Sequence, residues 1–259
     1  MYFYLYDTFV QEQKHEVELI SIEHKLIDFG INGKIGKLSV LKNIEQMTKT
    51  AVLEGAHTIV IVGNDKTFSR ALKTLANEDV AIGYLPLDPK SRYAQILGIN
   101  DLSTAVEIIS KRVIKKIDIG WINNTIYFLT SVEILGNDVV IECDKKFKII
   151  PEKDISKISI CNFGNILEGK ELLKNNLCDP NDGNLQINFY KKNSKGVMFK
   201  KITNKDTALP AKKLFLTNKG ETDNQISLEV DGEIVAKTPA TVELAHKKIN
   251  LIVGRERMF

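Results

Sequence analysis

The chain has 259 residues, enough for one large domain or two of ordinary size. Hydrophobic residues make up 43% and charged residues 27%, which is typical of a globular protein with a sizeable core. The formal net charge of +3 is too small for the concentrated basic stripe of a nucleic-acid-binding protein, so no nucleic acid partner is expected. It is compatible with peripheral contact with an anionic membrane or with a phosphate-bearing ligand.

The cysteines and the N-terminus favour a cytoplasmic protein. Cys143, Cys161 and Cys178 are far apart and form no CxxC pair, so reduced thiols are expected rather than a disulfide framework or a zinc site. No apolar run approaches the about 18 residues of a membrane span. Residues 1–7 lack the basic start of a signal peptide and predict a strand. We therefore expect a cytoplasmic chain, with peripheral membrane contact left open.

The first 110 residues alternate strand and helix patterns. Strands are predicted at residues 2–6, 25–29, 58–62 and 80–85. Helices are predicted from Ser39 to about Glu54, over 68–75, and from Asp101 or Ser103 to about Lys111. Residues 58–62 are an unbroken β-branched run, as in a parallel strand buried on both faces. This half is therefore predicted to be an open α/β sheet covered by helices.

The pattern changes near Val113, after which strands and turns dominate. Strands are predicted at 117–122, 125–129, 139–143, 147–150, 155–161, 185–190, 197–202, 213–217, 226–230 and 248–253. Hairpin turns are expected at Asn123-Asn124 and around Asp144. The prediction is an α/β domain over 1–112 and a β-sandwich domain over 113–246, with the tail 247–259 packing back on the first domain.

The segment Gly63-Asn64-Asp65-Lys66-Thr67 lies between a buried strand and a helix. Ligands bind at such carboxyl ends of strands in open α/β sheets, and a helix N-terminus attracts phosphate. A glycine lets the backbone approach the ligand, and a carboxylate can hold the accompanying magnesium. By itself, such a segment is more often an ordinary strand-to-helix turn.

Six segments in a fixed order change that interpretation. They are residues 54–67, 82–87, 94–99, 116–120, 181–185 and 230–233. Together they resemble diacylglycerol kinases and related lipid kinases, whose first loop has the sequence Gly-Gly-Asp-Gly-Thr. The resemblance covers roughly residues 50–253. NAD kinases share this fold and first loop, but residues 86–99 are more similar to the lipid kinases.

The resemblance implies transfer of the terminal phosphate of ATP to a lipid hydroxyl, such as that of diacylglycerol, with ATP and magnesium as cofactors. The implied nucleotide-binding residues are Gly63, Asn64, Asp65, Lys66, Thr67, Asp88 and Lys90. Within this set Asp65 would hold the magnesium nucleotide, and Thr67 would cap the helix near the phosphates.

The resemblance also implies catalytic and metal-binding acids in the second half. Asp231 would be the general base, and Glu233 would lie beside it near the metal. Asp118 would join this acidic network, and Asp182 would hold a structural magnesium with the carbonyls of Asp179 and Asn184. The Asp-Gly pairs at 182–183 and 231–232 also suit plain β-turns.

The chain departs from the family pattern where phosphate should bind. Asn64 and Lys66 replace glycines of the first loop, and Arg70 stands where the family often has glutamate. In the second loop Asp88 and Pro89 replace Gly-Thr. An aspartate there repels a phosphate oxygen at about 4 Å by about 1 kcal/mol in water and about 4 kcal/mol at a partly buried site. Proline also removes a backbone N–H.

Three hypotheses follow. The favoured one is a divergent or inactive kinase relative that binds a ligand, a lipid or a partner protein. The second is an active ATP- and magnesium-dependent lipid kinase in which Lys66, Lys90 and Arg92 supply new phosphate contacts. The third is a nucleotide-binding regulatory protein. An exposed strand edge in the β half leaves a homodimer open as well.

Overall fold

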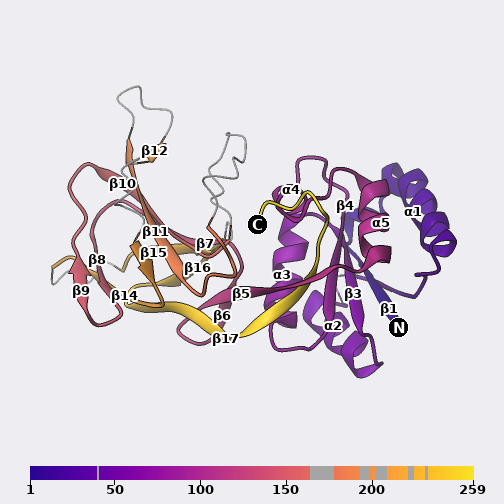
Figure 1. Ribbon diagram of the computed structural model, residues 1–259, viewed down its shortest axis with the longest axis horizontal. Coiled ribbons are helices and arrows are strands. Elements are labelled where there is room, and N and C mark those ends of the chain that lie inside the picture. The colour runs from indigo at the N-terminus through magenta and orange to yellow at the C-terminus, as the bar shows by residue number, and fades with distance from the viewer. Residues whose placement is uncertain (40, 164–177, 193–198, 202–208, 221–224, 231–232) are drawn as a thin grey trace. The chain divides into compact units, whose positions relative to one another are not determined.

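The computed structural model describes all residues except 40, 164–177, 193–198, 202–208, 221–224 and 231–232 (Figure 1). The chain forms two compact units. The α/β unit comprises Met1–Ile117 with Lys247–Phe259, and the β unit comprises Asp118–His246. None of the helices in the described ranges is long and apolar enough to cross a membrane.

The α/β unit is built on a parallel sheet. Its strands are β1 (Tyr2–Tyr6), β2 (Lys34–Lys37), β3 (Thr58–Gly63), β4 (Ala81–Pro86) and the end of β17 (Ala240–Ile252). They lie in the order β2-β1-β3-β4-β17, and every neighbouring pair is parallel. Every residue of β3 and β4 is buried, because helices cover both faces of the sheet. The predicted open α/β sheet is therefore confirmed.

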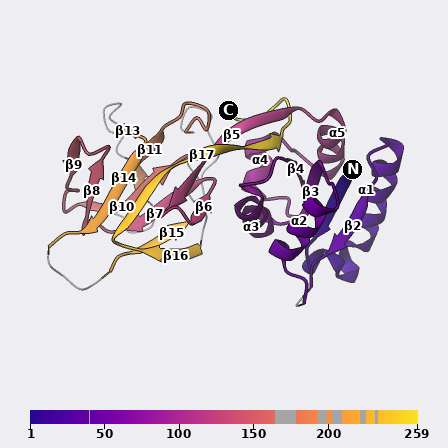
Figure 2. The ribbon, with the colours of Figure 1, turned by 90° about the horizontal axis from the view of Figure 1, so that it is seen from below.

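Five α-helices accompany this sheet. They are α1 (Glu16–Asp28), α2 (Ile44–Leu53), α3 (Asp65–Leu75), α4 (Arg92–Leu97) and α5 (Leu102–Lys111), with 3-10 turns η1 (Phe9–Gln11) and η2 (Gln13–His15) before α1. Figures 1 and 2 both show α1 beside α5, while α2 packs beside α3. Asp101 caps α5 by accepting a hydrogen bond from the Thr104 N–H at 2.7 Å, as one of the two predicted caps.

Two local predictions are wrong. Residues 25–29 are not a strand. They belong to α1 and its C-cap, because Ile22 and Leu26 follow helical spacing and bury one face. The second strand is β2, which lies further along the chain. The next helix is capped by Asn43 and not by Ser39, whose hydroxyl instead accepts a hydrogen bond from the Lys42 N–H at 3.2 Å in a turn.

In the described residues, the β unit contains a separate antiparallel sheet and antiparallel strands of the mixed sheet that also holds β1 to β4. The strands after α5 are β5 (Ile114–Ile122), β6 (Ile126–Phe128), β7 (Ser131–Leu135), β8 (Val139–Cys143), β9 (Phe147–Ile149), β10 (Ile155–Cys161), β11 (Leu185–Lys192), β12 (Phe199–Lys201), β13 (Leu209–Ala211), β14 (Lys213–Asn218), β15 (Ser227–Val230) and β16 (Glu233–Lys237). One sheet has the order β12-β11-β10-β7-β15-β16, with β13 beside β11. In the other, β17-β14-β8-β9 are neighbours.

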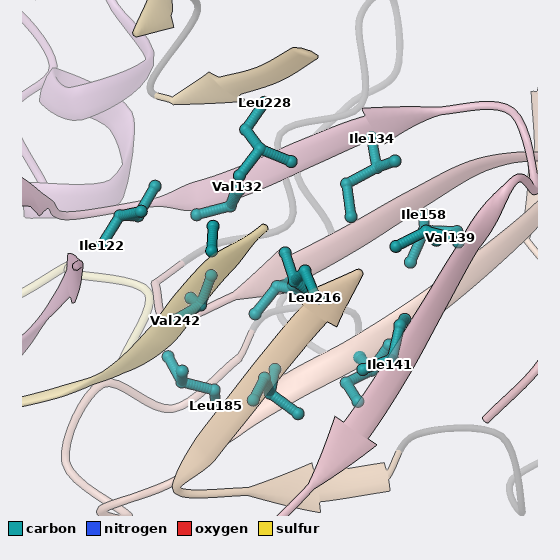
Figure 3. Close-up of a cluster of buried hydrophobic side chains, with 14 of the residues drawn as sticks. Ile122, Val132, Ile134, Val139, Ile141, Ile158, Leu185, Leu216, Leu228 and Val242 are labelled. Atoms are coloured by element: carbon teal, nitrogen blue, oxygen red, sulfur yellow. The ribbon is translucent and has the colours of Figure 1, made fainter. Parts of the chain in front are cut away.

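The two sheets enclose one apolar core. Ile141, Leu216 and Val242 from one sheet share this core with Val132 and Ile158 from the other (Figure 3). The predicted β-sandwich is thus confirmed.

The hairpin turns adopt the conformations expected from their residues. Asn123 and Asn124 have φ of 50° and 59°, and Asp144 and Lys145 have φ of 49° and 57°. These left-handed pairs are the type I′ turns that join twisted antiparallel strands. The strand expected at 248–253 is wrong in extent: β17 begins at Ala240 and pairs with β14 before it reaches β4. Part of the strand expected at 197–202 lies outside the described residues.

Candidate functional site

The strand order of the α/β unit creates a switch point. From β1 the chain passes to β2 on one side, and then returns to place β3 on the other side of β1. Crossover helices of such sheets diverge at this point and leave a crevice at the carboxyl ends of the strands. A pocket of about 600 Å³ opens here. Its lining comes from the segments after β1, β2 and β3: Asp7, Thr8, Phe9, Glu12, Leu38, Ser39, Lys42, Asn43, Ile44, Asn64, Lys66, Thr67 and Arg70. We call it the switch-point pocket.

The first loop is tied to the end of β1. The Asn64 side chain caps α3 by accepting a hydrogen bond from the Thr67 N–H at 3.0 Å, so the cap is Asn64 and not Thr67 as expected. The Thr67 hydroxyl instead donates to the Asp7 carboxylate. A Cβ at Gly63 would lie 3.3 Å from the Cβ atoms of both Asp7 and Thr67, closer than most Cβ contacts. Glycine therefore lets the two strand ends approach each other.

Asp65 joins the first loop to the second. Its carboxylate accepts hydrogen bonds from the Tyr84 hydroxyl at 3.1 Å, from the Ser91 hydroxyl, and from the Arg92 N–H at 2.8 Å. Burial, and then the Asp65 charge, raise the pKa of Tyr84 well above its usual value, so its hydroxyl stays a donor. Asp65 does not line the switch-point pocket.

The second loop is exposed and faces a different pocket. Asp88 accepts a hydrogen bond from the Lys90 N–H at 2.9 Å, and Ser91 caps α4 through the Ala94 N–H at 3.0 Å. Asp88 and Pro89 line a pocket of about 770 Å³ between α1 and the segment 86–103. Lys90 lines neither pocket. The structure therefore gathers Asn64, Lys66 and Thr67 at the switch point and separates Asp88 and Lys90 from them.

Positive charge dominates the switch-point pocket. Lys42, Lys66 and Arg70 line it together with the acids Asp7 and Glu12. The capping residues of α2 and α3 line it as well, so both helices begin there. Each helix N-terminus carries the equivalent of about half a positive charge, and the site therefore attracts anions.

Sequence reasoning assigned no site role to Asp7 or Lys42 and noted Arg70 only as a family mismatch. The signal that could have found them is position, because Asp7 directly follows β1 and Lys42 lies soon after β2. Because the second strand was predicted at 25–29 and not at β2, the sequence did not indicate that Lys42 follows the end of a strand.

The structure brings two predicted metal-binding residues of the β unit together. Burial, and then the negative charges of Asp179 and Asp118, raise the pKa of Asp182, although the Asn184 N–H donates to its carboxylate at 2.8 Å. Asp118 is 6% exposed, and its N–H donates to the Pro180 carbonyl at 2.9 Å. In the described part of the chain no three His, Cys, Asp or Glu side chains converge as metal ligands.

This arrangement fits a magnesium ion, which commonly takes one or two carboxylates and completes its coordination shell with other oxygen atoms and water. The structure says less about the two predicted catalytic acids. Asp231 lies outside the described residues, and Glu233 begins β16 in a partly buried position.

The diacylglycerol kinase catalytic domain family matches residues 5–122. This match covers most of the α/β unit. This confirms the resemblance drawn from the sequence motifs. No curated protein matches the chain.

Solved structures show the same fold over the whole chain. A diacylglycerol kinase from Bacillus anthracis strain Sterne is 16% identical with a TM-score of 0.77, covering 99% of this chain and 97% of that one. A putative diacylglycerol kinase from the same strain is also 16% identical with a TM-score of 0.77, covering 99% and 98%. A further structure of this kind is 15% identical with a TM-score of 0.75. At these identities the likeness concerns the fold.

Proposed function

We propose that this diacylglycerol kinase-like protein binds a phosphate-bearing ligand in its switch-point pocket and lacks the ATP-dependent transfer of the family. The observation that carries the proposal is the gathering of three cations and two helix N-termini around one pocket of about 600 Å³. A nucleotide is the expected ligand class, because the surrounding domain is that of the diacylglycerol kinase catalytic family.

The charges of the pocket support anion binding. Three cationic side chains face two carboxylates, and the helix N-termini add about one further positive charge. The Asp7 carboxylate accepts a hydrogen bond from Thr67, which holds it against the loop. An arginine in such a site can form two parallel hydrogen bonds to one phosphate group. Arg70 is therefore the side chain expected to contribute most to affinity.

The arrangement of the acids supports the absence of transfer. Phosphoryl transfer depends on positioning and on magnesium ions that neutralise the phosphate charge. Asp65, the first-loop carboxylate expected to hold that magnesium, already accepts three hydrogen bonds from Tyr84, Ser91 and Arg92. Asp88 of the second loop lines the other pocket.

An active lipid kinase is the second candidate, and the Asp118–Asp182 pair favours it. Asp182 would hold a structural magnesium with nearby carbonyl oxygens, and Asp118 would add negative charge beside it. Asp231 would take the proton of the acceptor hydroxyl, with Glu233 beside it. A nucleotide-binding regulator without a lipid acceptor is the third candidate.

Calorimetric titration with ATP and with ADP, each with and without magnesium, tests ligand binding. Arg70→Ala should weaken binding by about 10- to 150-fold, because a hydrogen bond to a charged group contributes about 1.5–3 kcal/mol. Lys49→Ala, which removes an exposed cation of α2 that does not line the pocket, is the matched control and should bind as the natural chain does.

Transfer of labelled phosphate from ATP to diacylglycerol in mixed micelles tests the second half of the proposal. We expect no transfer above background. Transfer by the natural chain that Asp231→Asn abolishes would establish the active kinase instead. Equal affinity of Arg70→Ala and Lys49→Ala for the nucleotides would refute the assignment of the pocket.

A further inference from the structure

Helix α1 exposes an apolar stripe to solvent. Val17 is 80% exposed, Ile20 is 50% exposed and Ile27 is 64% exposed. Their spacing of three and seven residues places them on one side of the helix, whereas Ile22 and Leu26 are buried on another side. A helix that needs only one buried face to pack on its sheet here carries a second apolar face.

A groove runs beside this stripe. It is the pocket of about 770 Å³ whose one wall is formed by α1 and whose other wall is formed by residues 86–89 and 99–103, together with α4. Val17 belongs to both the stripe and the groove, so the two form one continuous surface. Ile22, Leu87 and Ile99 contribute apolar lining. Lys25 bridges the groove by donating a hydrogen bond to the Ser103 hydroxyl at 2.6 Å.

The surface is acidic although the whole chain carries a net charge of +3. Helix α1 carries four carboxylates against one lysine, which leaves the helix at −3, and one of these carboxylates, Glu18, lines the groove. Asp88 and Asp101 add two more carboxylates along the groove. An anionic membrane surface would be repelled here, whereas a cationic apolar partner would be attracted.

We propose that the groove between α1 and the segment 86–103, with the adjoining stripe of α1, docks a basic amphipathic helix of a partner protein. Apolar side chains of the partner would cover Val17, Ile20 and Leu87, and its lysines or arginines would approach Glu18, Asp88 and Asp101. Helices bind apolar grooves in this manner through side chains spaced three and four residues apart. The proposal is independent of the anion site, because no residue lines both pockets.

The docking surface also accounts for the unusual second loop. Asp88 and Pro89, which depart from the phosphate-binding pattern, form part of the groove wall. An aspartate there repels phosphate but complements a cationic helix.

The probe for the test is a fluorescent amphipathic peptide of leucine and lysine, about five helical turns long. A peptide with glutamate in place of lysine is its matched control. Anisotropy measures affinity for the full chain, and amide hydrogen exchange locates the peptide. We expect the lysine peptide alone to bind and to protect α1 and residues 86–103 from exchange.

Substitutions in the surface should weaken the complex. Val17→Ser with Ile20→Ser should lower affinity about tenfold or more, because central apolar contacts dominate such interfaces. Glu18→Lys with Asp88→Lys should weaken binding and reduce its salt dependence. Leu53→Ser removes an 88% exposed leucine of α2 and should leave affinity unchanged. Circular dichroism checks that each variant is folded.

Three results would overturn the proposal. Equal binding of the lysine and glutamate peptides would remove the role of charge. Protection of α1 by anionic phospholipid vesicles, and not by the peptide, would assign the surface to a membrane. Dimerisation of the natural chain in sedimentation, lost in the Val17→Ser and Ile20→Ser variant, would make a second copy the occupant.

Discussion

Replacement of Asp65 by alanine should lower the stability of the α/β unit even when no ligand is bound. The carboxylate accepts hydrogen bonds from the hydroxyls of Tyr84 and Ser91 and from the Arg92 N–H. Tyr84 and Ser91 are each 1% exposed, so their hydroxyls lose a charged acceptor in a buried site. One such bond is worth about 1.5–3 kcal/mol, but such effects are not additive, and water can enter at the partly exposed Asp65. The expected loss in the free energy of unfolding is about 2–4 kcal/mol.

Urea unfolding measures this loss, and the chain offers a separate signal for each unit. The single tryptophan, Trp121, lies in the β unit, whereas all described helices lie in the α/β unit. Far-ultraviolet circular dichroism therefore follows mainly the unit that contains Asp65. Its midpoint should fall by about 1–2 M, since such domains lose about 1–3 kcal/mol of stability per molar urea. The midpoint by tryptophan fluorescence should move less.

Glu45→Ala is the matched control, because Glu45 is also an acid in the first turn of a helix and is exposed. It should cost only the favourable interaction with the helix dipole, about 0.3–1 kcal/mol. The reasoning fails if Asp65→Ala is no less stable than Glu45→Ala and yet abolishes binding of magnesium–ATP. Asp65 would then act on the nucleotide and not on the second loop.

Three further outcomes are expected. The Thr104 backbone N–H lowers the pKa of Asp101. The stability that this cap provides is therefore present above the usual pKa of an aspartate and is lost as the pH falls through the lowered pKa. Asp101→Asn should remove that acid dependence in urea titrations. Magnesium at a hundred times its Kd should stabilise the β unit by about 2.7 kcal/mol through mass action, and so raise the urea midpoint of Trp121 fluorescence. Asp182→Asn should abolish the increase, and no increase in the natural chain would exclude this metal site. Gly98 has φ of +76°, and a Cβ there would lie 2.5 Å from a backbone nitrogen, so Gly98→Ala should lower the thermal midpoint by the equivalent of about 1–3 kcal/mol. An unchanged midpoint would contradict the close approach.

Much of the fold follows from patterns that act over a few residues. The β-branched run 58–62 predicted a strand buried on both faces, and β3 is buried along its whole length. Asn123-Asn124 predicted a tight hairpin because asparagine tolerates positive φ. Asp101 predicted a helix start because its side chain reaches a backbone N–H three residues later. Such features depend on local geometry, so neighbouring residues suffice to predict them.

Local patterns give a wrong prediction where the same residues suit either a strand or a helix. Residues 25–29 contain enough apolar side chains for a strand, but α1 extends through residue 28 because its buried positions follow a helical period. The full length of β17 was also not predicted from the sequence. Polar residues interrupt its apolar pattern, and its two ends pair with strands distant in sequence.

The sequence by itself determined the two fold classes, the loop at 63–67 and, through its motifs, the family. Only the tertiary structure decided which residues that loop contacts. The switch-point pocket joins side chains from the ends of three strands, among them Asp7, Lys42 and Arg70. Asp65 accepts hydrogen bonds from Tyr84 and Ser91, because β3 and β4 are neighbours in the sheet. The direction of a side chain depends on which strands pair, and strand pairing is a property of the whole unit.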